Sequence, residues 1–301
     1  MYLRDQLTHE MHKVIIGTWS FSYEAVTTAR NALLLSQSSI HSIEKGVNSI
    51  EENMNYGPCI VGIGGPRNSH GFLEMDAAVM NGRHLQFGAV TALKGFSKPI
   101  SVARSVMEHC THSMLTAEGA RIFAEKEGFT FKPELASEAN NGEMQHQSHD
   151  TLGLIVLDGD DISCGVSTSG MPNKHPGRVG DSALPGNGLY ADVTGGAACC
   201  SGDGDFILKF CPAFHVVQLL KQGKEPKEAC KIVISDMKNR SSDYFEISII
   251  AVNMKGEYGT GTTVESWKDP LEKDKTYNGF PYVVWTSGMD EPVCLCQETS
   301  T

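Results

Sequence analysis

Hydrophobic and polar positions along the chain predict short strands and amphipathic helices in its first half. Residues 14–18 are mostly apolar and predict a short strand. Ile40, Ile43, Val47 and Ile50 then recur with the spacing of one face of an amphipathic helix. We expect a helix here that buries this face.

The same pattern predicts further strands and helices before residue 130. An apolar segment at 59–66 predicts a strand that runs into a Gly/Pro turn. Residues 72–93 predict two strands joined at the Asn-Gly dipeptide 81–82, which is a strong hairpin signal. Helices are expected at 100–110 and 117–128.

The character of the sequence changes in the middle of the chain. Residues 130–150 are polar and have no period, so they are the best linker candidate. An apolar run that begins at Thr151 predicts two strands separated by an acidic Gly turn within 151–169. Residues 170–204 are rich in Gly and Pro and predict irregular structure, in a segment too long for an idle loop.

The remaining sequence predicts helix at 207–237, with a break near 223–226, and strands at 245–253 and 281–285. Strands at hairpin distance and grouped helices favour antiparallel sheets covered by helix layers over a doubly wound parallel sheet. At 301 residues the chain is long for one domain but compatible with a single α+β domain.

Composition argues against two kinds of partner. The formal net charge is −11 and no Lys/Arg cluster offsets it, so nucleic acid is not expected as a partner. No apolar run approaches the roughly 18 residues of a membrane-spanning helix, so no membrane partner is expected. The N-terminus has scattered charges and no apolar core of signal-peptide length. The expected compartment is cytoplasmic if the chain is complete, or lysosomal if a eukaryotic signal peptide is missing.

The cysteines and histidines do not predict a metal site or a cofactor. Nine cysteines with irregular spacing and no C-x-x-C pair are typical of free thiols in a reducing compartment rather than of a disulfide framework. The His109–His112 segment has a ligand-like spacing, but without further ligands it is interpreted as structural.

The junction between Asp150 and Thr151 raises a chemical question. An internal Thr is a poor nucleophile unless a base is close by, and no His/Asp pair at a recognisable spacing supplies one. Cleavage of this junction would give Thr151 its own α-amino group, whose pKa of about 7.7–8.0 suits a general base. The alternative is that Thr151 only opens a strand, which Thr does readily.

Motifs of the second half carry a resemblance to a known family. "HDTLGLIVLD", "GVSTSG", "GRVGDSALPGNGLYAD" and "SGDGD" resemble the glycosylasparaginases, or aspartylglucosaminidases, which are N-terminal-nucleophile hydrolases. In the first half "GTW", "VGIGG", "MDAAVMNG" and "FGAV" match in the same order. The resemblance therefore covers nearly the whole chain.

The resemblance implies a fold, a processing step and an activity. It implies a four-layer αββα sandwich, made as an inactive precursor that cleaves itself into an α chain, 1–150, and a β chain, 151–301. His149, Asp150 and Thr151 would form the cleavage site. The activity would be hydrolysis of the amide bond between N-acetylglucosamine and asparagine in glycoprotein breakdown, without a cofactor. The resemblance also implies a homodimer of αβ units.

The resemblance further implies roles for the residues that act on the substrate amide. Thr151 would attack the side-chain carbonyl carbon, and Thr168 would lie beside it and hydrogen-bond its amine or hydroxyl. The hydroxyl of Ser201 and the backbone N–H of Gly202 would form the oxyanion hole.

Four other residues would bind the substrate. Arg178 presents a planar fork suited to the free α-carboxylate of the asparagine moiety. Asp181 would take the α-ammonium, Gly204 would let the backbone approach, and Trp19 would line the pocket. Without the resemblance, Arg178 and Asp181 are also compatible with a surface ion pair.

Two departures from the family pattern keep alternatives open. Pro66 stands where the family usually has Ser, and Ser201 replaces the usual Thr. The alternatives are an isoaspartyl peptidase/L-asparaginase of the same superfamily, or an inactive relative that acts as a binding protein. Trp19 and the "SGDGD" motif favour the glycosylasparaginase.

Overall fold

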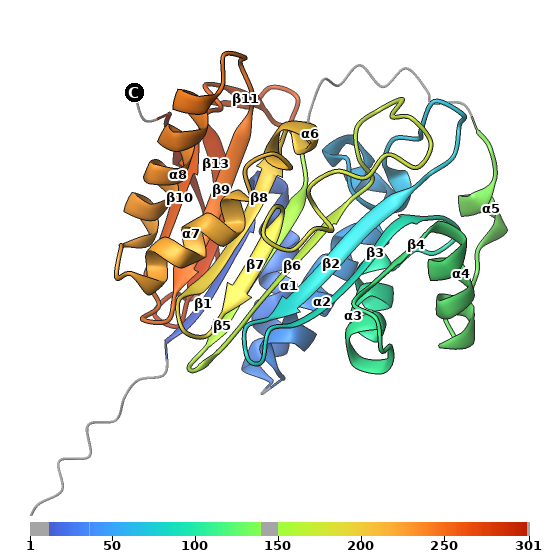
Figure 1. Ribbon diagram of the computed structural model, residues 1–301, viewed down its shortest axis with the longest axis horizontal. Helices are drawn as coiled ribbons and strands as arrows, with labels where there is room; N and C mark the ends of the chain where they lie inside the picture. Colours follow the sequence, from blue (N-terminus) through green and yellow to red (C-terminus); the bar gives the residue numbers. More distant parts are fainter. Residues whose placement is uncertain (1–11, 36, 140–149, 300–301) are drawn as a thin grey trace, which may run out of the picture.

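The computed structural model describes residues 12–35, 37–139 and 150–299, which form a mixed α/β fold with two main sheets (Figure 1). The large sheet contains, in spatial order, β14 (Val293–Gln297), β13 (Phe280–Thr286), β1 (Lys13–Thr18), β5 (Leu152–Asp158), β6 (Asp161–Thr168), β2 (Met75–Asn81), β3 (Gln86–Leu93) and β4 (Met114–Thr116). The small sheet contains β10 (Tyr258–Thr262), β9 (Ile247–Asn253), β8 (Gly196–Gly202) and β7 (Leu189–Asp192).

Strand pairing in both sheets is antiparallel except between β3 and β4. The order of the large sheet interleaves the two halves of the chain, because β1 lies between β5 and β13 while β2 pairs with β6. A break at residue 150 would therefore leave the halves joined by their strand ladders. A separate two-stranded ribbon pairs β11 (Trp267–Lys268) with β12 (Thr276–Tyr277).

Helices cover both sheets. The helices are α1 (Tyr23–Leu34), α2 (Ser39–Glu51), α3 (Pro99–His109), α4 (Ala117–Lys126), α5 (Pro133–Ala136), α6 (Gly204–Ile207), α7 (Pro212–Lys221) and α8 (Pro226–Arg240). Helices α1, α2 and α3 contact strands of the large sheet, and α7 and α8 contact strands of the small sheet. The two sheets also contact each other, through β5 and β6 on one side and β8 on the other.

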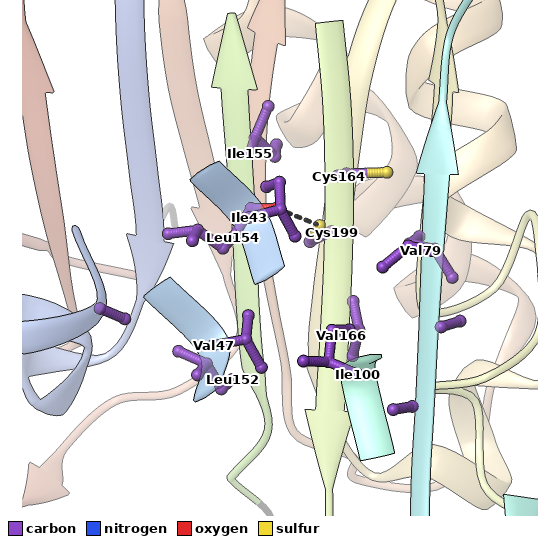
Figure 2. Close-up of a cluster of buried hydrophobic side chains, with 14 of the residues drawn as sticks. Ile43, Val47, Val79, Ile100, Leu152, Leu154, Ile155, Cys164, Val166 and Cys199 are labelled. Carbon is purple, nitrogen blue, oxygen red and sulfur yellow. Dashed lines mark hydrogen bonds between the residues drawn. The ribbon is translucent and has the colours of Figure 1, made fainter. Parts of the chain in front are cut away.

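The close approach of α2 to the large sheet depends on a glycine in β6. Leu154 and Gly165 are direct partners in the β5–β6 pairing. A methyl group at Gly165 would lie 2.4 Å from Cγ2 of Ile43, so glycine here allows α2 to approach the sheet. Figure 2 shows Ile43 of α2 and Ile100 of α3 over β5 and β6, with Cys199 of β8 donating a hydrogen bond to the Leu154 carbonyl.

Most of the elements expected from the sequence are confirmed, with small shifts at their ends. The amphipathic helix is α2, and Ile43, Val47 and Ile50 on its apolar face are fully buried. The strands expected at 72–93 and 151–169 form the β2–β3 and β5–β6 pairs. None of the helices in the described ranges is long and apolar enough to cross a membrane.

Two expectations are wrong. Residues 59–66 do not form a strand. They begin at the last residue of a 3₁₀ turn, Met54–Cys59, and contain a second 3₁₀ turn, Gly62–Gly64. Ile60 is in the left-handed region, with φ 58°, which a strand cannot accommodate. Residues 170–204 are not wholly irregular, because they contain all of β7 and β8. Strand β8 consists of Gly, Ala, Cys and Ser, small residues whose strand propensity is weak but which fit between closely packed layers.

Candidate active site

Residues from distant parts of the chain meet around one small cavity at the end of strands β6 and β8. Its volume is about 20 Å³, which is room for about one water molecule. The lining residues are Ile60, Asp150, Thr151, Thr168, Gly170, Met171, Arg178, Asp181, Ser182, Gly202 and Gly204. Most of the residues singled out from the sequence therefore share one site, although they lie on both sides of the expected cleavage point.

Thr151 is fixed in this cavity by its backbone. Its amide N–H donates to Oγ of Ser201 at 2.9 Å, and its carbonyl accepts from the hydroxyl of Thr18 at 2.6 Å. The side-chain oxygen lies 3.4 Å from Oγ of Ser182, and only 4% of the residue is exposed. The run that opens at Thr151 thus places a buried hydroxyl at a defined point of the site, rather than at a strand end facing solvent.

Ser201 receives a second hydrogen bond from the indole of Trp19, whose Nε1–H donates at 2.8 Å. A hydroxyl has two acceptor lone pairs and one proton. The two N–H donors, from Thr151 and Trp19, occupy both lone pairs, so the hydroxyl proton of Ser201 is what remains to interact with a substrate atom. This geometry suits a hydrogen-bond donor to a developing oxyanion.

A pair of tryptophans spans the junction between Asp150 and Thr151. Trp19 stacks on Trp267 with ring centroids 5.1 Å apart, and Nε1 of Trp267 donates to the Asp150 carboxylate at 3.1 Å. Trp19 has φ 63° and ψ 162°, a backbone region that costs a non-glycine residue about 1–3 kcal/mol. The contacts to Ser201 and Trp267 hold it in this conformation.

Thr168 ends β6 and lines the same cavity as Thr151. In the uncut chain its hydroxyl donates to the carbonyl of Ile60 at 3.3 Å and accepts from the amide of Gly170 at 3.0 Å. Thr168 therefore lies beside the expected nucleophile, while its hydrogen bonds fix the turn that follows the strand.

Arg178 and Asp181 are not a surface ion pair with each other. The guanidinium of Arg178 binds Asp205 instead, with Nη2 donating to Oδ2 at 2.8 Å and Nε donating at 3.2 Å. Asp181 is 3% exposed, and its Oδ2 has no hydrogen-bond partner among the described residues. A buried carboxylate oxygen without a partner is costly for the protein, and it would suit a cationic group of a ligand.

Burial is the main reason why the pKa of Asp181 is raised to about 7. The positive charge of Arg178 acts in the opposite direction, and the negative charge of Asp205 raises the pKa further. Gly204 packs between these groups, because a methyl group there would lie 2.7 Å from Oδ1 of Asp181 and 2.9 Å from Nη2 of Arg178. Any side chain at this position would occupy the space in front of both.

Some expected features lie elsewhere or outside the described residues. His149 lies outside them. Pro66 is buried next to Gly65, at which a methyl group would clash with Oγ of Ser169, so this segment does pack close to Thr168. His109 binds Glu127 through Nδ1 at 2.9 Å, and the described ranges contain no cluster of three or more His, Cys, Asp or Glu able to hold a metal ion.

Three contributors to the site were missed from the sequence. Ser182 and Asp205 lie inside the motifs that carry the resemblance, so their positions were visible but their contacts were not. Asp205 lies in the first turn of α6. Trp267 had no sequence signal, because its contact with Asp150 joins residues 117 positions apart.

Comparison with known proteins gives consistent matches over most of the chain. The sequence model of the asparaginase family matches residues 5–141 and 130–278. The N(4)-(β-N-acetylglucosaminyl)-L-asparaginase of Rattus norvegicus is 31% identical, over 91% of this chain and 88% of the rat protein. The enzyme of the same name from Elizabethkingia miricola is 33% identical, over 82% of this chain and 77% of its own length.

A relative with a different printed activity matches at a similar level. The isoaspartyl peptidase/L-asparaginase of Xenopus laevis is 33% identical, over 81% of this chain and 82% of its own length. Identity alone does not separate the two activities.

Proposed function

The chain belongs to the asparaginase family, and we propose that it is an autoprocessed amidohydrolase that cleaves the bond between N-acetylglucosamine and asparagine. The expected enzyme, an N4-(β-N-acetylglucosaminyl)-L-asparaginase, is supported by the relatives from rat and Elizabethkingia. The observation that carries the proposal is the cavity that Thr151 and Asp181 line together, where the Thr151 amide donates to Ser201 and the buried Oδ2 of Asp181 has no hydrogen-bond partner among the described residues.

The first step of the proposal is self-cleavage. The Thr151 hydroxyl attacks the carbonyl carbon of Asp150, the C–N bond of that peptide breaks, and an ester forms while the nitrogen becomes the free α-amine. Water then hydrolyses the ester and leaves Asp150 as a C-terminal carboxylate. The contacts of Trp267 with Asp150 and of Ser201 with Thr151 support this step, because they hold the two sides of the bond in place.

Self-cleavage would also make room for substrate. A cavity of about 20 Å³ is far too small for glycosylasparagine. Asp150 forms part of the cavity wall, so movement of the new chain end away from Thr151 would enlarge the site. The single chain would then be inactive for two reasons, since it lacks both the α-amine and the space.

In the second step the α-amine of Thr151 acts as general base. Its pKa of about 7.7–8.0 allows it to take the proton of the hydroxyl on the same residue. The oxygen attacks the substrate amide carbon, and the Ser201 hydroxyl and the Gly202 N–H stabilise the oxyanion. Removing one such donor typically costs about 3–4 kcal/mol of transition-state stabilisation. The glycosylamine leaves, water hydrolyses the aspartyl ester, and aspartate is released.

Arg178 and Asp181 orient the substrate through its amino-acid end. The α-ammonium would bind the buried Oδ2 of Asp181, which has no partner among the described residues. The α-carboxylate would bind the guanidinium edge of Arg178 that Asp205 does not occupy. Gly204 leaves space between the two. Thr168 is assigned to position the amine or hydroxyl of Thr151.

We extend the proposal to the assembly of the protein. The packing of helices on both sheets, and of the sheets on each other, supports the four-layer αββα sandwich of N-terminal-nucleophile hydrolases. The family resemblance supports a single domain that becomes an α chain, 1–150, and a β chain, 151–301, and a homodimer of such units. Light scattering on the processed protein would test the dimer.

The second candidate function is isoaspartyl peptidase activity, because the Xenopus relative carries that name. The two substrates share the aspartyl end and differ in the leaving group, so the leaving-group side of the site must distinguish them. Arg178 is the one basic residue among those that line the described cavity. If it binds the α-carboxylate, no lining cation is left for the second carboxylate of a β-aspartyl dipeptide, whereas an uncharged sugar needs none. The carboxylates of Asp203 and Asp205 accept hydrogen bonds from the Glu246 amide and from Arg178.

The test is a side-by-side assay of purified protein at neutral pH with both substrates and with Thr151→Ala as the inactive control. We expect a higher kcat/KM for N-acetylglucosaminyl-asparagine than for a β-aspartyl dipeptide. The reverse order would assign the chain to the isoaspartyl peptidases, and no hydrolysis of either substrate would leave the binding-protein alternative.

A further inference from the structure

Three buried charged residues lie behind the active-site cavity and take no part in the proposed reaction. Lys174 is 4% exposed, Glu74 is 4% exposed and Asp76 is fully buried. Lys174 lies on the segment after β6, while Glu74 and Asp76 lie at the start of β2. Buried ion groups contribute little net stability compared with apolar residues of the same volume, so their placement calls for another explanation.

Two hydrogen bonds join the segment around Lys174 to Glu74 at the start of β2. The Lys174 ammonium donates to the backbone carbonyl of Glu74 at 2.8 Å. In return, the amide of Gly177 donates to the Glu74 carboxylate at 3.0 Å. These two contacts enclose residues 174–177, and Arg178 follows directly.

The same lysine also packs against the cavity wall. A methyl group at Gly170 would lie 2.8 Å from Nζ of Lys174, so the ammonium lies directly against this glycine. Gly170 lines the cavity and donates its N–H to Thr168. On the adjacent strand, Asp76 is the direct partner of Thr168 in the β2–β6 pairing, and its charge interacts with that of Lys174.

We propose that Lys174, Glu74 and Asp76 form a positioning unit that holds segment 170–178, and with it the guanidinium of Arg178, at the substrate site. The inference rests on the proposed function, because it assigns these residues a task in binding the α-carboxylate. Self-cleavage places the members of this unit in two different fragments. After the cut, Glu74 and Asp76 belong to the first fragment and Lys174 to the second, so the two hydrogen bonds between Glu74 and residues 174 and 177 fasten the binding segment of one fragment to the other.

The charges of these buried groups depend on one another. Burial lowers the pKa of Lys174 below its ordinary value, and the nearby carboxylates of Asp76 and Glu74 oppose part of this decrease. Burial likewise raises the pKa of Asp76, and the charge of Lys174 opposes that increase. Arg178 also lies within electrostatic range and disfavours a second positive charge, which leaves the two carboxylates as the groups that balance Lys174. Removing one partner leaves the others buried and uncompensated, and the segment is then expected to loosen.

The test uses processed full-length protein with Lys174→Met and, as a matched control, Lys231→Met, which removes an exposed lysine on α8. Two substrates are compared: glycosylasparagine and the N-acetylglucosaminyl amide of 3-aminopropanoic acid, which keeps an amine but lacks the α-carboxylate. For Lys174→Met we expect the KM for glycosylasparagine to rise by about tenfold or more, the scale of one lost charge-assisted contact. The kcat should change much less, and the KM for the analogue should stay near the wild-type value.

Amide hydrogen exchange over 170–178 supplies a readout that does not depend on activity. Lys174→Met should speed exchange in this segment, and Lys231→Met should not. If Lys174→Met does not fold, Glu74→Ala replaces it, because it removes the acceptor for Gly177, while Glu74→Gln keeps an acceptor and should be milder.

An equal rise in KM for both substrates, or unchanged KM together with unchanged exchange, would overturn the positioning role. Failure of the proposed function is a separate outcome. In that case wild-type protein does not hydrolyse glycosylasparagine, and faster exchange in Lys174→Met still supports the tether.

Discussion

Replacing Asp181 by Asn should stabilise the protein and weaken substrate binding at the same time. The carboxylate is buried, and one of its oxygens has no hydrogen-bond partner among the described residues. Asn has nearly the same shape but carries no charge. If Asp181 is buried in order to bind an ammonium group of the substrate, the substrate-free protein bears the free-energy cost of burying its charge, and removal of that charge should raise the free energy of unfolding.

The size of the effect follows from the pKa. Burial raises the pKa of Asp181 from its ordinary value of 3.8 to about 7. At pH 8 the carboxylate is ionised in both the folded and the unfolded chain, and a shift of about 3 units corresponds to about 4 kcal/mol of destabilisation. This is an upper bound for the gain in Asp181→Asn, because the buried amide must also find hydrogen-bond partners.

The direction in which the free energy of unfolding changes with pH is a more specific prediction than the size of the change. Because the folded pKa is raised, the folded chain binds this proton more strongly than the unfolded chain, so wild-type stability falls as pH rises from about 4 to about 7. At pH 5 the destabilisation is only about 2 kcal/mol, because the folded carboxyl is still protonated. The stability gain of Asp181→Asn should therefore be roughly twice as large at pH 8 as at pH 5.

Urea unfolding at the two pH values measures this difference. Both chains carry Thr151→Ala, which keeps them uncut and gives a single-chain transition. Processed Asp181→Asn should in addition show a strongly raised KM for glycosylasparagine. A variant that is less stable than its parent at pH 8, or whose stability difference does not change with pH, would refute the reasoning.

Three further predictions concern the reaction. Arg178→Lys keeps the charge but loses the planar fork, so the KM for glycosylasparagine should rise while gel analysis shows normal self-cleavage. Ser201→Ala should lower kcat by about 10²–10³-fold, and precursor should accumulate on a gel, because the hydroxyl contacts both the Thr151 amide and the expected oxyanion position. The acid limb of kcat/KM should report two groups that must lose a proton, the Thr151 α-amine with a pKa of about 7.7–8.0 and Asp181 with a pKa of about 7, and Asp205→Asn should lower only the second pKa, because the charge of Asp205 raises the pKa of Asp181.

Sequence reasoning succeeded where local pattern and packing agree. Helix α2 was predicted from its apolar spacing, because Ile43, Val47 and Ile50 face the sheet and are fully buried. The β5–β6 pair was predicted because an acidic Gly turn separates two apolar runs. In both cases neighbours in sequence supply the periodicity, and burial in the large sheet reinforces it.

Local pattern failed where contacts between distant residues decide the backbone. The apolar segment 59–66 turns instead of extending, because Gly62, with φ 71°, lies against the backbone of Glu51. Strand β8 was missed because Gly, Ala, Cys and Ser give little strand signal, although close packing between the layers selects small residues there.

The site shows the same division. Motifs located most of its residues, but the partners of those residues were not visible. Arg178 and Asp205 are 27 positions apart, and the pairing of Lys174 with Glu74 spans 100 positions. No periodicity in the sequence reports such contacts, since they arise only when β2 pairs with β6 in the large sheet and β8 of the small sheet packs against β6.

Mass spectrometry of freshly purified protein tests the central claim most directly. Wild-type protein should give two fragments, 1–150 and 151–301, and N-terminal sequencing of the second should read Thr-Leu-Gly. Thr151→Ala should give one intact mass and no activity towards N-acetylglucosaminyl-asparagine. A wild-type preparation that hydrolyses this substrate while remaining a single intact chain would contradict the account, because Thr151 would then lack the α-amine on which the mechanism depends.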